Sequence, residues 1–285
     1  MGKTTSALNL AAALREMGKR VLLVDLDPQG SLTVASGVLD VDRVPLSIGE
    51  LLMGRAQGAP IDINRAILRT PCGLDLVPGN GMLSAAELTL AVAFNRESVL
   101  QQTLKPAVDR YDYILIDCLP SLGLIAINAL RAADGVVIPV QADFLAVQGL
   151  AQILETIGAV REQLNPELSV YGVLLTMVEP RKAHAQRVMA TVRHSLSGDV
   201  PVFETEILQH VAFKEAAEAG QSIFDFAPGS PPAEMYRRLA REVRLAAGEL
   251  TVTAAVAPRS TGLFGGLLRG LTGRKLAGAE AAYGA

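Results

Sequence analysis

The chain is poor in the residue types that build disulfide-rich, metal-cluster or membrane proteins. Its 285 residues include no tryptophan and two cysteines, Cys72 and Cys118. Cysteines this far apart exclude a disulfide framework and a Cys-x-x-Cys metal site, and they favour a reducing, cytosolic compartment. No apolar run approaches the ~20 residues that a membrane-spanning helix needs. The N-terminus shows no signal-peptide pattern. A formal net charge of −3 gives no overall attraction to nucleic acid, so any DNA contact must come from a local basic patch.

Short apolar runs alternate with stretches of helical spacing along most of the chain. The predicted strands cover residues 20–26, 73–80, 111–118, 135–141, 169–178 and 200–207. The predicted helices cover residues 4–18, 82–110, 122–134, 146–164, 182–196 and 231–250. Strands joined by helical crossovers form a doubly wound, mostly parallel α/β sheet with helices on both faces, and ligands bind beyond the carboxyl ends of its strands. We predict one domain over 1–248 and a Gly/Ala-rich tail over 249–285 outside the fold.

The first helix begins with half of a phosphate-binding motif. Residues 2–5 read Gly-Lys-Thr-Thr, which matches the end of G-x-x-x-x-G-K-[ST], a loop whose backbone amides cradle phosphates. Lys3 would reach the β and γ phosphates, and the Thr4 hydroxyl is placed for Mg²⁺. The alternative is an ordinary helix start capped by a threonine.

Three acids follow apolar runs at predicted strand ends. Asp25 and Asp27 end the run "VLLVDLD" at positions i and i+2, which share one face of a strand, and Asp117 ends "YILID". An acid that ends a central strand beside a phosphate loop suits Mg²⁺ coordination. Each acid alone also fits a helix cap or a turn, but all three beside Gly-Lys-Thr favour a metal–nucleotide site.

These pieces resemble a known family in their order and spacing. The matching stretches are "GKTTSALNLAAAL", "VLLVDLDPQGSLT", "YDYILIDCLPSLGLIAINAL", "VVIPVQADFLAVQGL", "GVLLTMV" and "FKEAAEAGQSIFDFAPGSPPAEMYRRLAREV". Over about residues 1–247 the chain is similar to the ParA/MinD family of deviant Walker-A P-loop ATPases, most of all to Soj-like ParA partition proteins. The resemblance implies ATP and Mg²⁺ as cofactors, ATP hydrolysis, and an ATP-driven sandwich dimer.

The resemblance also implies a role for each site residue. Phosphates and Mg²⁺ would be held by Gly2, Lys3, Thr4 and Thr5. Asp27 would position the attacking water with Asp25 near the metal, and Asp117 would be the Walker-B acid. The metal ligands would be Thr4, Asp27 and Asp117, and the catalytic residues Lys3 and Asp27. Met177 to Glu179, with the segment after Ile207, would flank adenine.

The family loop reads K-G-G-V-G-K-T-T and follows the first, central strand of the sheet. Met1 stands where the family has Val. A GTG codon encodes Val inside a gene but Met when it is used as a start codon. We therefore expect that the start of this chain was assigned to an internal GTG codon of a longer gene. The alternative is a truly truncated protein. In either case the chain as printed lacks that strand, two glycines and the signature Lys, and we expect it to bind nucleotide poorly.

The resemblance leaves the anchoring surface open. The family commonly has I-P-R-N-V-R where this chain has "ILQHVA", so Ala212 replaces an Arg that contacts DNA in some relatives. Arg237, Arg241 and Arg244 share one face of the last predicted helix, which fits non-specific contact with DNA phosphates or a plain solvated face. Arg181 to Arg193 is a weaker basic cluster. The stretch 263–275 resembles the basic amphipathic membrane helix of MinD relatives, but its glycines oppose a stable helix.

The leading hypothesis is therefore a cytoplasmic, ParA-like ATPase that partitions or positions DNA or another large cargo. A ParB-like or cargo-adaptor protein would stimulate hydrolysis, and nucleoid association would follow from DNA binding. The alternatives are a non-catalytic truncated copy or scaffold, and a MinD-like peripheral membrane ATPase.

Overall fold

The computed structural model describes residues 2–119, 121, 123–141, 144–196 and 200–250. Its strands are β1 (Val21–Leu26), β2 (Leu68–Arg69), β3 (Asp75–Val77), β4 (Tyr113–Cys118), β5 (Gly135–Gln141) and β6 (Ser169–Thr176). Its α-helices are α1 (Lys3–Glu16), α2 (Ser31–Ala35), α3 (Ile48–Ala56), α4 (Met82–Ala91), α5 (Val99–Leu104), α6 (Leu124–Ala132), α7 (Phe144–Gln163), α8 (Ala183–Ser195), α9 (Ala212–Glu218), α10 (Ile223–Phe226) and α11 (Pro231–Ala246). Short 3₁₀ turns are η1 (Val41–Arg43), η2 (Ile63–Arg65), η3 (Arg96–Ser98) and η4 (Lys105–Arg110).

Helix α1 ends where its sequence predicts. Gly18 has a left-handed φ of 80°, a conformation that glycine adopts without a steric penalty. Its amide donates to the carbonyl of Arg15 at 2.9 Å, and the amide of Lys19 donates to that of Leu14 at 3.0 Å. These bonds satisfy carbonyls that the last helical turn leaves open. The chain then turns directly into β1.

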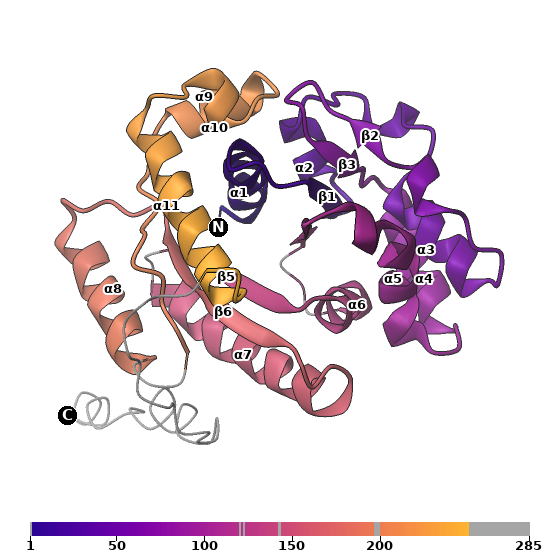
Figure 1. The fold of residues 1–285 in the computed structure, drawn as a ribbon. Helices are drawn as coiled ribbons and strands as arrows, with labels where there is room; N and C mark the ends of the chain where they lie inside the picture. The colour runs from indigo at the N-terminus through magenta and orange to yellow at the C-terminus, as the bar shows by residue number, and fades with distance from the viewer. Residues whose placement is uncertain (1, 120, 122, 142–143, 197–199, 251–285) are drawn as a thin grey trace, which may run out of the picture.

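The strands form the mostly parallel sheet that the alternating pattern predicts. One sheet has the order β2-β3-β1-β4, in which β1 runs parallel to both β3 and β4, and β2 adds an antiparallel edge. A second sheet pairs β5 with β6 in parallel. In the register of β1 with β4, Asp25 lies opposite Asp117. The carboxyl ends of both strands therefore bring two predicted site residues side by side. Figure 1 shows α1 lying between β1 and α11.

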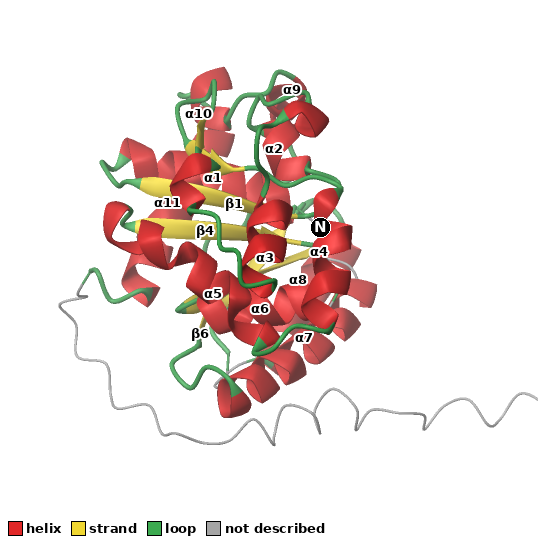
Figure 2. Cartoon of the chain, turned by 90° about the vertical axis from the view of Figure 1, so that its right-hand side faces the viewer, coloured by secondary structure: helices red, strands yellow, loops and turns green. Residues whose placement is uncertain are grey.

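Helices cover both faces of the sheets, as expected for a doubly wound fold. Helices α1 and α11 pack together over one face, in a core that includes Leu23 of β1 and Leu174 of β6. Helices α3 to α6 cover the other face of β1, around Leu22 and Val24. In Figure 2, β1 and β4 lie side by side in the middle of the molecule with helices around them.

The two sheets are not paired with each other in the described part of the chain. There β4 pairs only with β1, and β5 pairs only with β6. All residues of β1 are buried, whereas the apolar residues of β4 are all only half-buried. The outer edge of β4 is thus open among the described residues. A central strand ahead of residue 2 stays a prediction.

The predicted strand over 200–207 is wrong. The segment runs beside β6 but forms no continuous strand. The amides of Phe203 and Ile207 donate to the carbonyls of Val173 and Leu175, and the ladder is broken into isolated bridges from Val202 and from Leu208 just after the segment. The reason lies in α11. The carboxylate of Glu242 accepts from the amides of Glu204 and Thr205 at 2.8 and 3.0 Å. These two amides therefore point at a side chain instead of at a neighbouring strand.

The end of the domain is tied down by ion pairs. Glu249 binds Lys19 at 2.8 Å and Arg244 at 3.1 Å. Among the described residues, no helix combines the length and apolarity needed to cross a membrane. The structure does not describe residues 251–285, so the predicted tail from residue 251 on, including 263–275, lies outside the described residues.

Candidate functional site

The start of α1 has the geometry of an anion site. Gly2 caps the helix in the left-handed region, with φ 72°, and no side chain bonds to the helix start. The first amides of a helix lack carbonyl partners within it and lie at the positive end of its dipole. No acidic residue occupies the first turn. The alternative of a threonine-capped helix start is therefore wrong, and the amides after Gly2 suit a phosphate.

Thr4 of α1 and Asp117 of β4 meet directly. The Thr4 hydroxyl donates to Asp117 Oδ2 at 2.7 Å. Asp117 is 3% exposed, and burial raises its pKa to about 7, against the opposing effects of the Thr4 bond and the charge of Lys3. Asp117 has no ion-pair partner in the part of the chain that the structure describes. A buried carboxylate of this kind is typical of a functional site.

The two acids after β1 differ in their surroundings. Asp25 is fully buried, and both its oxygens accept bonds, Oδ2 from Thr33 and Oδ1 from the Asp27 amide. Burial raises its pKa, which these bonds counteract. Asp27 is half-buried, and its Oδ1 accepts from the Gln29 amide at 2.9 Å. Asp27 is therefore the acid of this pair with accessible surface at the site.

The carboxyl end of β6 joins the same edge. A methyl group on Gly2 would lie 3.5 Å from the side chain of Thr176, the last residue of β6. Met177 follows with a left-handed φ of 51°, which costs a non-glycine residue about 1–3 kcal/mol and often marks a functional position. Glu179 pairs with Lys182 at 2.7 Å. The residues predicted to flank adenine thus begin next to the predicted phosphate loop.

The residues present fit Mg²⁺. Thr4 and Asp117 supply a hydroxyl and a carboxylate, the hard oxygen ligands that Mg²⁺ prefers. In the described residues, no group of three or more His, Cys, Asp or Glu side chains forms a metal cage. Mg²⁺ is usually held by one or two protein oxygens together with substrate phosphates and water. The geometry matches a metal bound with a nucleotide.

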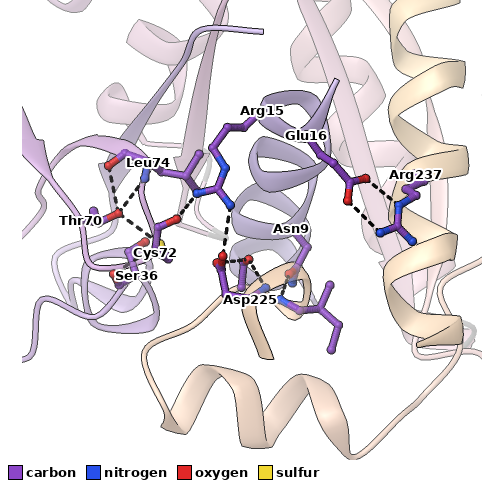
Figure 3. A network of polar contacts seen from close by, with 11 residues as sticks. Asn9, Arg15, Glu16, Ser36, Thr70, Cys72, Leu74, Asp225 and Arg237 are labelled. Carbon is purple, nitrogen blue, oxygen red and sulfur yellow. Dashed lines mark hydrogen bonds and ion pairs between the residues drawn. The ribbon is translucent and has the colours of Figure 1, made fainter. Parts of the chain in front are cut away.

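The arginines of α11 are mostly engaged within the chain. Figure 3 shows Arg237 beside Glu16 of α1, with bonds of 2.6 and 2.8 Å between them. The guanidinium of Arg237 also stacks on Phe224, and Arg244 pairs with Glu249 at 3.1 Å. Arg241 is more than half exposed, with Glu234 at 3.7 Å. DNA contact by these arginines stays a prediction, in which phosphates would compete with Glu16 and Glu249.

Three residues at this edge had no assigned role from the sequence. Thr33 and Gly79 lie beside Asp25, and Thr176 lies beside Gly2. Their positions depend on contacts between segments far apart in the chain. Locally, Gly79 and Thr176 stand just after or at the end of an apolar run, and Thr33 follows the turn after one.

Comparisons with known proteins place the chain in a family. A family model described as an AAA domain matches residues 1–170. The sporulation initiation inhibitor protein Soj of Bacillus subtilis is 42% identical over 85% of this chain and 93% of its own length. The chromosome-partitioning ATPase Soj of Thermus thermophilus is 42% identical over 85% of this chain and 90% of its own. Cobyrinic acid a,c-diamide synthase of Mycobacterium smegmatis, solved with ADP and magnesium, has a TM-score of 0.74 and 33% identity over 90% of this chain and 94% of that one.

The helix start, the buried acid and the parallel sheet define a P-loop nucleotide-binding protein. Within this class, the chain belongs to the ParA/MinD family of P-loop ATPases, as its sequence predicts.

Proposed function

We propose that this protein hydrolyses ATP with Mg²⁺ and uses ATP-dependent dimerisation to position DNA or another large cargo. The observation that supports it most is the 2.7 Å contact between Thr4 and Asp117. It joins the predicted phosphate loop to a buried strand-end acid, as a metal–nucleotide site requires. Relatives named as chromosome-partitioning proteins support the proposal that the cargo is DNA. A ParB-like or adaptor protein would stimulate turnover, in the cytoplasm and on the nucleoid.

Different residues of this chain would bind the phosphates, hold Mg²⁺ and orient the attacking water. The amides after Gly2 would bind phosphate oxygens, and Lys3 would neutralise charge on the β and γ phosphates. Thr4 and Asp117 would hold Mg²⁺, which supplies charge stabilisation for the transferring phosphoryl group. Asp27 would orient the attacking water. Phosphoryl transfer depends mainly on positioning and electrostatic stabilisation, which this arrangement offers.

The first test concerns phosphate binding. A version extended upstream with the family's strand and K-G-G, with Met1 replaced by Val, should bind ATP–Mg²⁺. Lys3→Ala in it should abolish binding because the phosphates lose their cation. Isothermal calorimetry measures both, with the exposed Lys105→Ala as the control that keeps affinity. Equal ATP affinity of the printed and extended chains would contradict the phosphate-loop assignment.

The second test separates binding from hydrolysis. In the extended protein, Asp27→Ala should keep ATP affinity, stop turnover and favour the ATP-bound dimer, because water loses its orienting group. Phosphate release and light scattering measure these effects, and the exposed Asp42→Ala is the matched control. Retained turnover with an unchanged oligomeric state would refute the role of Asp27.

A further inference from the structure

We propose that Thr33 is a positioning residue of this site: through Asp25 and Gly79, it fixes the turn that carries Asp27. The inference rests on the proposed ATPase function and adds a residue to it. Thr33 lies on α2, six residues after Asp27, and its side chain is fully buried. It would not touch nucleotide or water itself. Its effect would pass through the backbone of residues 25–30.

The hydroxyl of Thr33 joins two segments of the chain. It donates to Asp25 Oδ2 at 2.7 Å and accepts from the Gly79 amide at 3.0 Å. The backbone amide of Thr33 donates to the same Oδ2 at 2.8 Å. A hydroxyl has one proton to donate and lone pairs to accept. Both capacities are therefore used, and Thr33 is fully buried, where a lost partner is costly.

Asp25 passes this constraint to Asp27. Its other oxygen, Oδ1, accepts from the Asp27 amide at 3.1 Å. The turn closes with a 2.9 Å bond from the Gly30 amide to the Asp27 carbonyl, and Asp27 Oδ1 accepts from the Gln29 amide. Asp27 Oδ2 has no bond to the residues that the structure describes. The turn thus holds one oxygen of Asp27 and leaves the other for a ligand.

Two glycines let the segments approach closely enough for this network. A methyl group on Gly79 would lie 2.5 Å from the Asp25 carbonyl oxygen and 3.0 Å from that of Asp27. Gly30 has a φ of 62°, and a methyl group there would lie 2.9 Å from the Gly79 carbonyl oxygen. A side chain larger than that of glycine would clash at either position. The two glycines thus bring the segments within reach of the Thr33 hydroxyl, which bonds both.

The test compares Thr33→Val, which keeps the shape but removes the hydroxyl, with Thr33→Ser, which keeps the hydroxyl. Amide hydrogen exchange, measured by NMR without nucleotide, reports on the amides of Asp27 and Gly79. Losing a buried bond costs about 1–3 kcal/mol, so Thr33→Val should speed their exchange about 10- to 100-fold. In the extended ATPase, Thr33→Val should lower kcat about tenfold or more with KM for ATP within about twofold. Thr33→Ser should restore both.

The matched control is Thr103→Val. Thr103 is also buried, but among the residues that the structure describes its hydroxyl bonds only to Val99 of its own helix. This variant should lose stability without a local change at Asp27 or in kcat. If Thr33→Val does not fold, Thr33→Ala removes the hydroxyl without placing a methyl group against the Gly79 amide, and takes its place.

Unchanged exchange at Asp27 in the hydroxyl-free variant would overturn the proposal. So would a Thr33→Ser variant that behaves like Thr33→Val, because packing alone would then explain the effect. If the extended wild type shows no turnover, the proposed ATPase fails. The nucleotide-free exchange of the Thr33 variants still decides whether Thr33 fixes the turn.

Discussion

The two ends of β4 shift the pKa of an aspartate in opposite directions. Asp112, just before the strand, is partly exposed and bonds Arg20 through the guanidinium and the backbone amide. Hydrogen bonding to Arg20 lowers its pKa to about 2. Asp117, five residues on, is buried beside Thr4, and its pKa is raised to about 7. The amino end of the strand stabilises a negative charge, and the carboxyl end penalises one.

This difference separates a structural edge from a functional one. At the amino edge, carboxylates already have cationic partners, as Arg69 with Asp75 also shows. At the carboxyl edge, Asp25 and Asp117 are buried opposite each other, and Lys3 is the cation that lowers the pKa of Asp117. Buried acids without a bonded cation are better suited to an added cation such as Mg²⁺ than to stabilising the fold alone.

The largest expected effect comes from removing the charge of Asp117. Its raised folded-state pKa means that the folding penalty is absent below pH 4, grows as pH rises, and is complete above about pH 7. Asp117→Asn should therefore raise the free energy of unfolding by about 2–4 kcal/mol at pH 8, with little gain at pH 4. In the extended protein it should also abolish Mg²⁺-dependent ATP affinity. Urea unfolding at both pH values and calorimetry measure these effects.

A loss of stability at pH 8 would contradict this picture of the carboxyl edge. It would mean that the Thr4 bond to the carboxylate contributes more than burial costs. The buried Asn128→Asp offers the reverse charge change elsewhere in the core and should destabilise the protein at pH 8.

The next largest effect is expected on DNA binding by the arginines of α11, two of which form close ion pairs within the chain. The α11 pattern predicts that replacing Arg237, Arg241 and Arg244 flattens the salt dependence of DNA binding by two to three units. Because Glu16 and Glu249 occupy two of these arginines, we expect a change of about one unit, from Arg241. Salt titrations of the ATP-bound triple Gln variant on unrelated duplexes measure it, with the exposed Arg43→Gln as control.

No DNA binding by the wild type at 50–100 mM salt, where several phosphate contacts should still hold, would remove DNA as the anchor. A protein partner or the 263–275 stretch would then be tested next. A slope change of two to three units would show that DNA phosphates displace both glutamates.

The smallest effect is expected at Asp112. Its lowered pKa stabilises the fold fully above pH 4, and the contribution is lost as pH falls through about 2. Asp112→Asn should lower the melting temperature slightly at pH 7, and the effect should shrink as pH falls from 4 through about 2. Because the carboxylate is exposed, salt should weaken the effect. A pH-independent change would assign it to the backbone bond of Arg20 instead.

Local sequence patterns predict the helices and strands better than they predict the contacts between distant segments. Gly18 ends α1 as expected, and the apolar runs became β1 and β4 because burial and spacing are local properties. The predicted strand over 200–207 is interrupted because Glu242, on a later helix, accepts hydrogen bonds from the amides of Glu204 and Thr205. Strand ends placed Asp25 and Asp117 at one edge. The hydrogen-bonded bridge through Thr33 could not be predicted from the sequence, because it needs Gly79 from a segment 46 residues away.

Helix α1 also has consequences for the order of folding. Its bonds reach almost the whole length of the domain, from Asn9 to Ile223, Arg15 to Asp225 and Glu16 to Arg237, at separations of 214, 210 and 221 residues. Closing such loops costs entropy before any contact repays it, and it slows folding. During synthesis on the ribosome, the helix that begins the predicted phosphate loop emerges early. It cannot complete its packing until α10 and α11 have left the exit tunnel.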